Sequence, residues 1–162
     1  MKASETKIPS WVASVVQEEG KLKGFYAENR FLSNFYDSSV TFEGLRYPSV
    51  ECAYQAAKVW PDDRKDFQTC TAAESKLLWK NYPPLDENAD QWNNRRYEVM
   101  AGLVFQKFHL HPGLRKRLLK TAPLYLEETN AWGDIYFGVD ITKGGENQLG
   151  RLLMKVRDFW TV

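Results

Sequence analysis

Cysteine and histidine are scarce in this chain of 162 residues, which contains two of each. Cys52 and Cys70 are too few and too loosely spaced for a zinc knuckle or a disulfide framework, so we expect two small buried thiols. His109 and His111 lie at the end of an expected helix, where capping explains them better than metal binding. The sequence therefore predicts neither a metal nor a cofactor, and a histidine-based triad has little support.

An excess of one charge and a long hydrophobic run are also missing. Lys and Arg total 22 against 21 Asp and Glu, so the net charge of +1 provides no field that attracts polyanions non-specifically. No apolar run approaches the roughly 20 residues of a membrane span, and the start, MKASETKIPS, lacks the hydrophobic region of a signal peptide. We expect a cytoplasmic protein with no membrane partner, and its oligomeric state is left open.

Hydrophobic periodicity and capping residues predict a mostly helical α+β fold with short strands, in one compact domain. A β-hairpin is expected around Glu43 and Gly44. Helices are expected from Ser49 to Val59, from Thr71 to Trp79, from Asp90 to His109, from Pro112 to Lys120, and after Asn147. We assign residues 24–162 to the catalytic domain and residues 1–23 to an N-terminal arm packed on it.

The stretch from Asn130 to Gly150 contains five of the ten glycines, interspersed with aromatic and acidic residues. Glycine permits close approach of the backbone, and aromatic rings provide flat apolar walls, so this pattern is typical of a binding loop. The segment that begins at Gly145 nearly matches a phosphate-binding GxxxxGK[ST] loop but lacks its Lys and its Ser or Thr. This excludes a nucleoside triphosphatase and leaves a general anion site at a helix start.

Two segments before the middle of the chain allow a structural and a functional interpretation. Ser33 and Asn34 lie inside an aromatic cluster, where Asn34 either forms an Asx turn or presents its amide to a ligand. Glu51, Gln55 and Lys58 follow one another at intervals of four and three residues, so they project from one helical face. Taken alone, that face is more simply explained as solvated than as a site.

Trp92 and Arg95 form a similar ambiguous pair three residues apart. An indole and a guanidinium at this spacing can hold a planar base and a phosphate. The start of an amphipathic helix explains the pair equally well.

The chain resembles the NADAR family, also called YbiA-like, in a series of blocks over residues 24–160. In order, the blocks are FLSNFY, YPSVECAYQAAK, the helix start with Trp92 and Arg95, NAWGDIYFG and GGENQLGRLLMKVR. The resemblance implies a compact, largely helical α+β domain that cleaves N-glycosidic bonds of phosphoribosyl or ADP-ribosyl compounds without a cofactor.

The resemblance also implies roles for individual residues. The family's functional acid falls on Glu51, its helix tryptophan on Trp92, and its second acid on Asp134. The chain departs from the family pattern at Phe137, where Trp is usual, and at Cys52, where His is frequent. These departures bear on the identity of the substrate more than on the reaction.

Cleavage of a ribosyl C–N bond builds positive charge on the sugar and negative charge on the departing base. In the first turn of a helix, Glu51 is expected to stay ionised and to activate water or stabilise the sugar cation. Asp134, between Trp132 and Phe137, is expected to protonate the departing base. Lys58 provides a second route, in which its amine attacks C1′ and forms a Schiff base.

The other predicted groups bind the substrate. The residues expected to stack on the base are Tyr36, Trp92 and Phe137. Asn34 and Gln55 are expected to recognise the identity of the base, with Ser33 and Trp132 nearby. The residues expected to hold phosphate are Arg30, Arg95, Lys143 and Asn147. The predicted substrate is ADP-ribosylated guanine in DNA or RNA. The alternatives are phosphoribosylaminopyrimidine intermediates of riboflavin synthesis, and a noncatalytic module that binds ADP-ribose or an NAD derivative.

Overall fold

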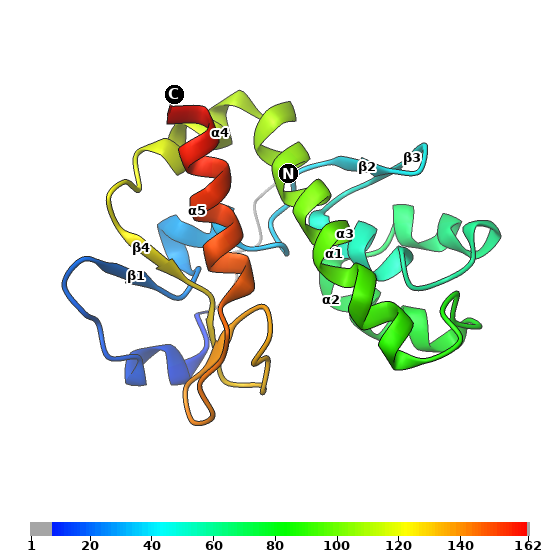
Figure 1. Cartoon of the computed structure of the whole chain (residues 1–162), viewed down its shortest axis with the longest axis horizontal. Coiled ribbons are helices and arrows are strands. Elements are labelled where there is room, and N and C mark those ends of the chain that lie inside the picture. Colours follow the sequence, from blue (N-terminus) through cyan, green and yellow to red (C-terminus); the bar gives the residue numbers. More distant parts are fainter. Residues whose placement is uncertain (1–7, 162) are drawn as a thin grey trace. The chain divides into compact units, whose positions relative to one another are not determined.

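The structure, a computed structural model, describes residues 8–161 and separates into two compact units (Figure 1). Unit 1 combines the described residues up to Ser33 with those from Lys120 onward, and unit 2 is Asn34–Leu119. The mostly helical α+β composition with short strands is confirmed. The division into an arm (residues 1–23) and a domain (residues 24–162) stays a prediction, and residues 1–7 and 162 lie outside the described part.

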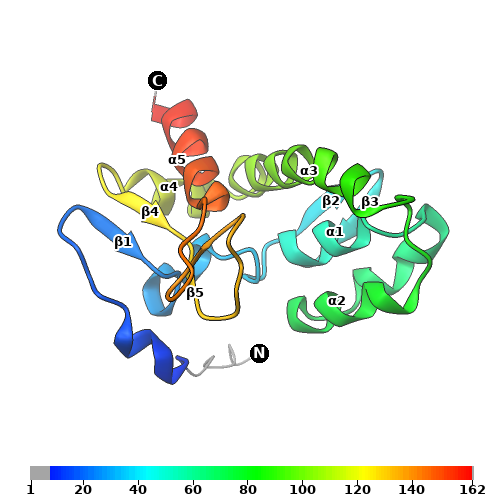
Figure 2. The ribbon, with the colours of Figure 1, turned by 60° about the horizontal axis from the view of Figure 1, so that its bottom comes forward.

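Unit 2 consists of a hairpin followed by helices. Its elements are β2 (Val40–Phe42), β3 (Leu45–Tyr47), α1 (Val50–Ala56), η3 (Pro61–Gln68), α2 (Ala72–Leu78), η4 (Trp79–Asn81), α3 (Ala89–Leu110) and α4 (Pro112–Leu119). The predicted hairpin is confirmed, and its turn residues Glu43 and Gly44 have φ of 46° and 83°, as the tightest hairpin turns require. Helix α1 packs against both α2 and α3 and lies between them (Figure 2).

Local capping explains where the helices of unit 2 begin. Ser49 Oγ accepts from Cys52 N at 3.1 Å, and the predicted capping box between Thr71 and Glu74 is present in both directions. The predicted start of the long helix at Asp90 is wrong. The N-cap of α3 is Asn88, whose Oδ1 accepts from Gln91 N at 3.0 Å, and Asp90 lies in the first turn.

Unit 1 is built from segments at the two ends of the chain. Its elements are η1 (Ser10–Ser14), β1 (Lys21–Lys23), η2 (Ala27–Leu32), β4 (Tyr125–Glu127), β5 (Thr129–Asn130), β6 (Val139–Asp140) and α5 (Gln148–Thr161). Strand β1 pairs in parallel with β4, and β5 pairs in parallel with β6. Helix α5 packs on β4 and buries Leu149, Leu152, Leu153 and Val156.

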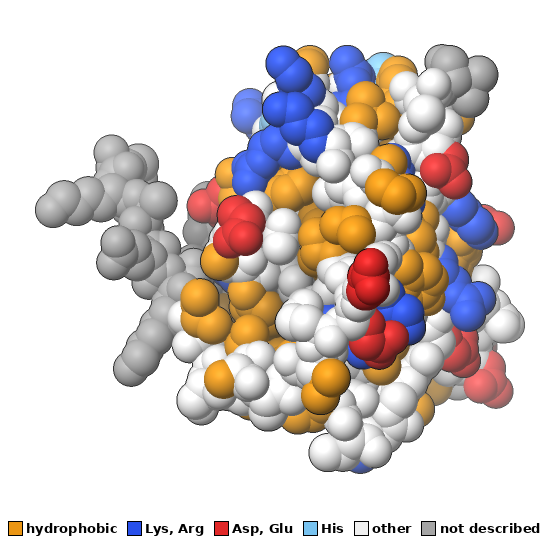
Figure 3. All heavy atoms as spheres, turned by 90° about the vertical axis from the view of Figure 1, so that its left-hand side faces the viewer, with side chains coloured by type: hydrophobic (Ala, Val, Ile, Leu, Met, Phe, Trp, Pro, Cys, Tyr) orange, Lys and Arg blue, Asp and Glu red, His pale blue; other side chains and the backbone are white. Residues whose placement is uncertain are grey.

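The surface contains scattered hydrophobic groups. Figure 3 shows hydrophobic side chains (orange) between charged ones on one face of the molecule, and Trp132 in unit 1 is 55% exposed. Within residues 8–161, no helix has both the length and the apolar character that crossing a membrane requires. The same part of the chain contains no group of three or more His, Cys, Asp or Glu side chains arranged to hold a metal ion.

Candidate active site around Lys58

Helix α1 carries a buried acid that is paired with a buried amide. Glu51 is 7% exposed and Gln55 is 4% exposed, and Gln55 Nε2 donates to Glu51 Oε1 at 2.7 Å. The backbone N–H of Glu51 donates to Asn34 O at 3.0 Å, which satisfies one of the free donors at the helix start. The structure therefore brings together two of the three residues that were expected on one helical face.

Lys58, the third of these residues, lies in the turn that follows α1, with its side chain against three aromatic rings. Its Nζ is 4.7 Å from the ring centroid of Trp79, 5.3 Å from that of Tyr54 and 5.6 Å from that of Trp92. Burial is the main cause that lowers the pKa of Lys58 to about 8, and the charge of Glu51 acts in the opposite direction. Near neutral pH, Lys58 therefore has far more neutral, nucleophilic amine than an ordinary lysine.

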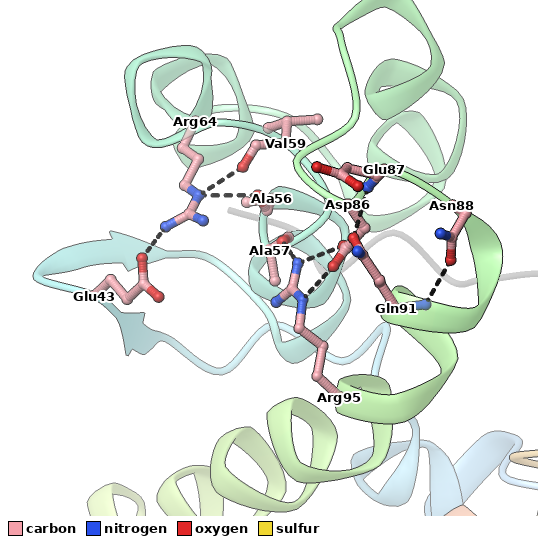
Figure 4. Close-up of polar contacts among 10 residues, drawn as sticks. All are labelled: Glu43, Ala56, Ala57, Val59, Arg64, Asp86, Glu87, Asn88, Gln91 and Arg95. Carbon is pink, nitrogen blue, oxygen red and sulfur yellow. Dashed lines mark hydrogen bonds and ion pairs between the residues drawn. The ribbon is translucent and has the colours of Figure 1, made fainter.

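Two arginines hold the turn that carries Lys58 (Figure 4). Arg64, only 1% exposed, donates from Nε to Ala56 O at 3.1 Å and to Val59 O at 3.2 Å. Arg95 donates from Nη2 to Ala57 O at 2.7 Å. Helix α1 ends at Ala56, although the sequence predicts a helix up to Val59, and these side-chain donors satisfy carbonyls at its end and in the turn that follows.

Each of these arginines is also paired with an acid. Arg64 forms an ion pair with Glu43, and Arg95 makes a two-bond contact with Asp86 at 2.9 and 2.8 Å (Figure 4). The guanidinium of Arg95 also lies 4.7 Å from the ring centroid of Trp92. These contacts favour a supporting role for Arg95, and its predicted contact with phosphate stays a prediction.

A cavity of about 360 Å³ adjoins Lys58 and is large enough for a small ligand. Its lining residues are Lys58, Trp79, Pro84, Asp86, Glu87, Asn88, Ala89 and Trp92. Lys58 and Trp92 were predicted from the sequence, whereas Trp79, Arg64 and Asp86 were not. The only sequence signal for Trp79 as a site residue is its aromatic character, because Lys58 and Trp79 lie in different elements and no local spacing predicts their contact.

Two other predicted residues of unit 2 have contacts away from this cavity. Asn34 is 8% exposed and donates from Nδ2 to Met100 Sδ at 3.2 Å. The Tyr36 ring lies beneath Lys107, whose Nζ is 5.7 Å from the ring centroid. Neither lines the cavity, so their roles in base recognition stay predictions.

In unit 1, the carboxylate of Asp134 is bound to its own loop. Its Oδ1 accepts from Tyr136 N at 3.2 Å and from Phe137 N at 3.0 Å. Asn130 fixes the backbone of Asp134, since Asn130 Oδ1 accepts from Asp134 N at 3.1 Å and Asn130 Nδ2 donates to Asp134 O at 2.8 Å. The catalytic role of Asp134 stays a prediction.

A second acid in this loop, Asp140, was not singled out from the sequence. Its Oδ1 accepts from the Thr142 hydroxyl at 2.7 Å and from the N–H groups of Thr142 and Lys143, while Oδ2 accepts from Gly133 N at 2.7 Å. These bonds, the Thr142 hydroxyl first, lower the pKa of Asp140 to about 2. The Asp-x-Thr spacing, which is typical of a local turn, is the signal that could have revealed it.

Asn147, a predicted phosphate ligand, joins strand β4 to helix α5. It is 2% exposed, and its Nδ2 donates to Leu126 O at 2.9 Å and to the Tyr125 hydroxyl at 3.2 Å, while Oδ1 accepts from Glu128 N at 3.0 Å. A Cβ on Gly150 would collide with Leu126 O. Packing of the loop thus explains both residues, and the anion site at the helix start stays a prediction.

The remaining predicted residues also belong to unit 1. Trp132 and Trp11 form a T-shaped pair with ring centroids 5.9 Å apart, and Phe137 and Tyr136 form another at 4.8 Å. The other three are Arg30 in η2, Ser33 at its end, and the exposed Lys143. Their predicted contacts with substrate stay predictions.

Comparison with known proteins gives matches over most of the chain. The family model of the NADAR domain matches residues 18–160. A riboflavin biosynthesis protein of Vibrio vulnificus is 36% identical over 132 residues, which are 79% of this chain and 35% of that protein. The N-glycosidase YbiA of Escherichia coli is 30% identical over 129 residues, 78% of each chain, and an N-glycosidase of Nostoc punctiforme is 37% identical over 131 residues, 78% and 82% of the two chains.

The structural comparison agrees with these matches. The NMR structure of E. coli YbiA superposes with a TM-score of 0.74 at 27% identity, over 90% of this chain and 88% of that one. The aligned residues correspond to about a third of the length of the Vibrio protein.

Proposed function

We propose that this chain, which belongs to the NADAR family, is an N-glycosidase that hydrolyses the bond between C1′ of a ribosyl group and the nitrogen of a base. Its relatives from E. coli and Nostoc punctiforme are named as N-glycosidases. The observation that carries the proposal is the position of the Lys58 amine, against three aromatic rings and within the electrostatic influence of the buried Glu51.

In the proposed reaction, Lys58 Nζ forms a bond to C1′ while the bond between C1′ and the base nitrogen breaks. The base leaves with a proton. The ribose ring then opens at its C1′–O4′ bond, the ring oxygen takes a proton, and the lysine nitrogen and C1′ become a Schiff base. Addition of water to C1′ releases the amine and the ribosyl product, so one water is consumed overall.

Glu51 supports this chemistry in two ways. Its carboxylate is held by Gln55 and can stabilise the positive charge that develops at C1′. It can also accept the proton that Lys58 Nζ releases as it bonds to carbon, since the charges of the two groups interact. The proton donor to the departing base that the sequence predicts is Asp134.

For the substrate we propose ADP-ribosylated guanine in nucleic acid. The form of the NAWGDIYFGVDITKGGENQLG loop, which resembles that of family members outside riboflavin synthesis, supports this choice. The second candidate is a phosphoribosylaminopyrimidine, because relatives from Vibrio vulnificus and Zea mays are named as riboflavin biosynthesis proteins.

Incubation with both substrates and with NAD, followed by chromatography of the released base, tests the function. We expect release from an ADP-ribosylated guanine oligonucleotide, and release from the aminopyrimidine alone would replace that substrate by the second candidate. Binding without release from any substrate would contradict the N-glycosidase and indicate a noncatalytic ADP-ribose reader.

Borohydride during turnover tests the role of the amine, because it reduces a Schiff base to a stable link. We expect the ribosyl group on the peptide that contains Lys58, none with Lys58→Arg, and unchanged trapping with the control Lys65→Ala, an exposed lysine of η3. Turnover without trapping would replace amine attack by attack of water activated by Glu51.

A further inference from the structure

We propose that the cavity beside Lys58 binds the departing base, and that Glu87 recognises a ring with an amino group next to a ring N–H. This inference rests on the proposed N-glycosidase function, because Lys58 must reach C1′ of the same substrate. It assigns Trp79 and Glu87 to the site, where the sequence indicated neither.

Two indoles form the walls of the cavity. Trp79 and Trp92 are both half-buried, come from separate elements, and line the same space of about 360 Å³. The Lys58 amine is near both rings, at 4.7 and 5.6 Å from their centroids. A flat heterocycle that stacks on either indole would therefore lie next to the amine that attacks its sugar.

The two acids that line the cavity, Asp86 and Glu87, differ in the hydrogen bonds of their carboxylates. Both carboxylate oxygens of Asp86 accept from Arg95. Within residues 8–161, the carboxylate of Glu87 makes no hydrogen bond or ion pair. The backbone of Glu87 is nevertheless fixed, because its N–H donates to Gln91 Oε1 at 2.8 Å. Glu87 is thus an exposed residue of the cavity lining whose two carboxylate oxygens are available as acceptors.

The chemistry of a free carboxylate determines which ring fits. Its two oxygens accept two parallel N–H donors, as they do from a guanidinium. A 2-amino-4-oxopyrimidine ring presents such a pair, the amino group and the adjacent ring N–H. Adenine presents its amino group beside an unprotonated ring nitrogen, whose lone pair would repel the carboxylate. Guanine and the aminopyrimidine of the second candidate both contain the favoured ring.

Calorimetric titration with guanosine and inosine tests the inference, since inosine lacks only the 2-amino group. The wild-type protein should bind guanosine about tenfold more tightly than inosine, because a charge-assisted hydrogen bond is lost with inosine. Glu87→Gln should reduce this preference to about twofold or less, since one charged acceptor pair is removed. Trp79→Leu should weaken both ligands about tenfold, because stacking does not depend on the base.

Matched controls are Asp90→Asn, an exposed acid of the first turn of α3, and Trp60→Phe, an exposed tryptophan of the same unit. Equal affinities in the wild type, a preference that persists in Glu87→Gln, or an equal loss in Asp90→Asn would overturn the inference. Selective binding of guanosine without hydrolysis of any substrate would refute the glycosidase and retain the base site. Hydrolysis unaffected by Glu87→Gln and Trp79→Leu would refute the base site and retain the glycosidase.

Discussion

Gln55 donates its amide N–H to the carboxylate of Glu51 at 2.7 Å, one helical turn away, and both side chains are buried. The other end of the amide, Gln55 Oε1, is buried and accepts no hydrogen bond from the described residues. A buried acceptor without a donor destabilises a fold by about 1–3 kcal/mol, so the Oε1 end of this amide contributes no stability. Orientation of Glu51 is the role that its contacts support.

Gln55→Met should therefore separate activity from stability. It keeps the length of the side chain but removes the donor to Glu51, and loss of a hydrogen bond to a charged group of about 1.5–3 kcal/mol predicts roughly a 10- to 100-fold fall in kcat. The midpoint of thermal unfolding should change little, because the unpaired Oε1 disappears too. Steady-state kinetics and thermal melts measure both, with Gln68→Met as control, since the Gln68 side chain donates to Arg46 O and, within residues 8–161, to no other group. A large fall in the midpoint with kcat unchanged would assign Gln55 to the fold alone.

The lowered pKa of Lys58 predicts how the rate depends on pH. The neutral amine attacks, and the pKa of Lys58 is about 8 in place of 10.5, so kcat/KM should rise about tenfold per pH unit between pH 6 and 7.5 and level off above 8. Initial rates at low substrate concentration across pH 6–10 give the profile. A plateau that begins below pH 7 would show that the amine is not the group whose deprotonation limits the reaction.

The two partners in the ion pair between Arg64 and Glu43 should contribute unequally to stability. Arg64→Met leaves Ala56 O and Val59 O without their side-chain donor. We expect this to lower the free energy of unfolding by about 3 kcal/mol. Glu43→Gln should cost less than about 1 kcal/mol, because the Glu43 side chain is 59% exposed. Urea denaturation measures both variants. Equal losses would mean that the ion pair, and not the two carbonyl contacts, is the source of the stability.

Asp140 should make unit 1 sensitive to acid. Its pKa is lowered from 3.8 to about 2 in the folded chain, so its contribution is complete above pH 3.8 and is lost as the pH falls through 2. Thermal melts at steps between pH 5 and 2 should show a fall for the wild type that is smaller for Asp140→Asn. Asp62→Asn, an exposed acid of η3, is the control and should follow the wild type. Parallel curves for wild type and Asp140→Asn would contradict the assignment.

The parts of the fold that sequence reasoning found correctly are local. The capping box of Thr71 and Glu74 and the turn at Glu43 and Gly44 depend on residues within three positions of each other, so spacing alone predicts them. The start of α3 was misplaced because Asn88 and Asp90 are both good N-caps, and only the bond to Gln91 N distinguishes them.

The site was predicted less completely, because its supports join segments that are distant in sequence. Arg95 contacts Ala57, and Trp79 contacts Lys58, and no local pattern indicates either pair. The glycine-rich loop shows the opposite difficulty. A Cβ on Gly145 would collide with Gly138 O, so the pattern that predicts a binding loop is already explained by close backbone packing.

The turn after α1 has a consequence for the entropy of substrate binding. The carbonyls from Ala56 to Val59 all accept hydrogen bonds from within unit 2, including Lys58 O, which accepts from Leu85 N at 2.9 Å. Fixing one residue's backbone costs about 1–2 kcal/mol, and here folding has already ordered the chain around Lys58. A substrate that reaches the amine then needs to restrict only the rotamers of one side chain, so more of its binding energy remains for the transition state.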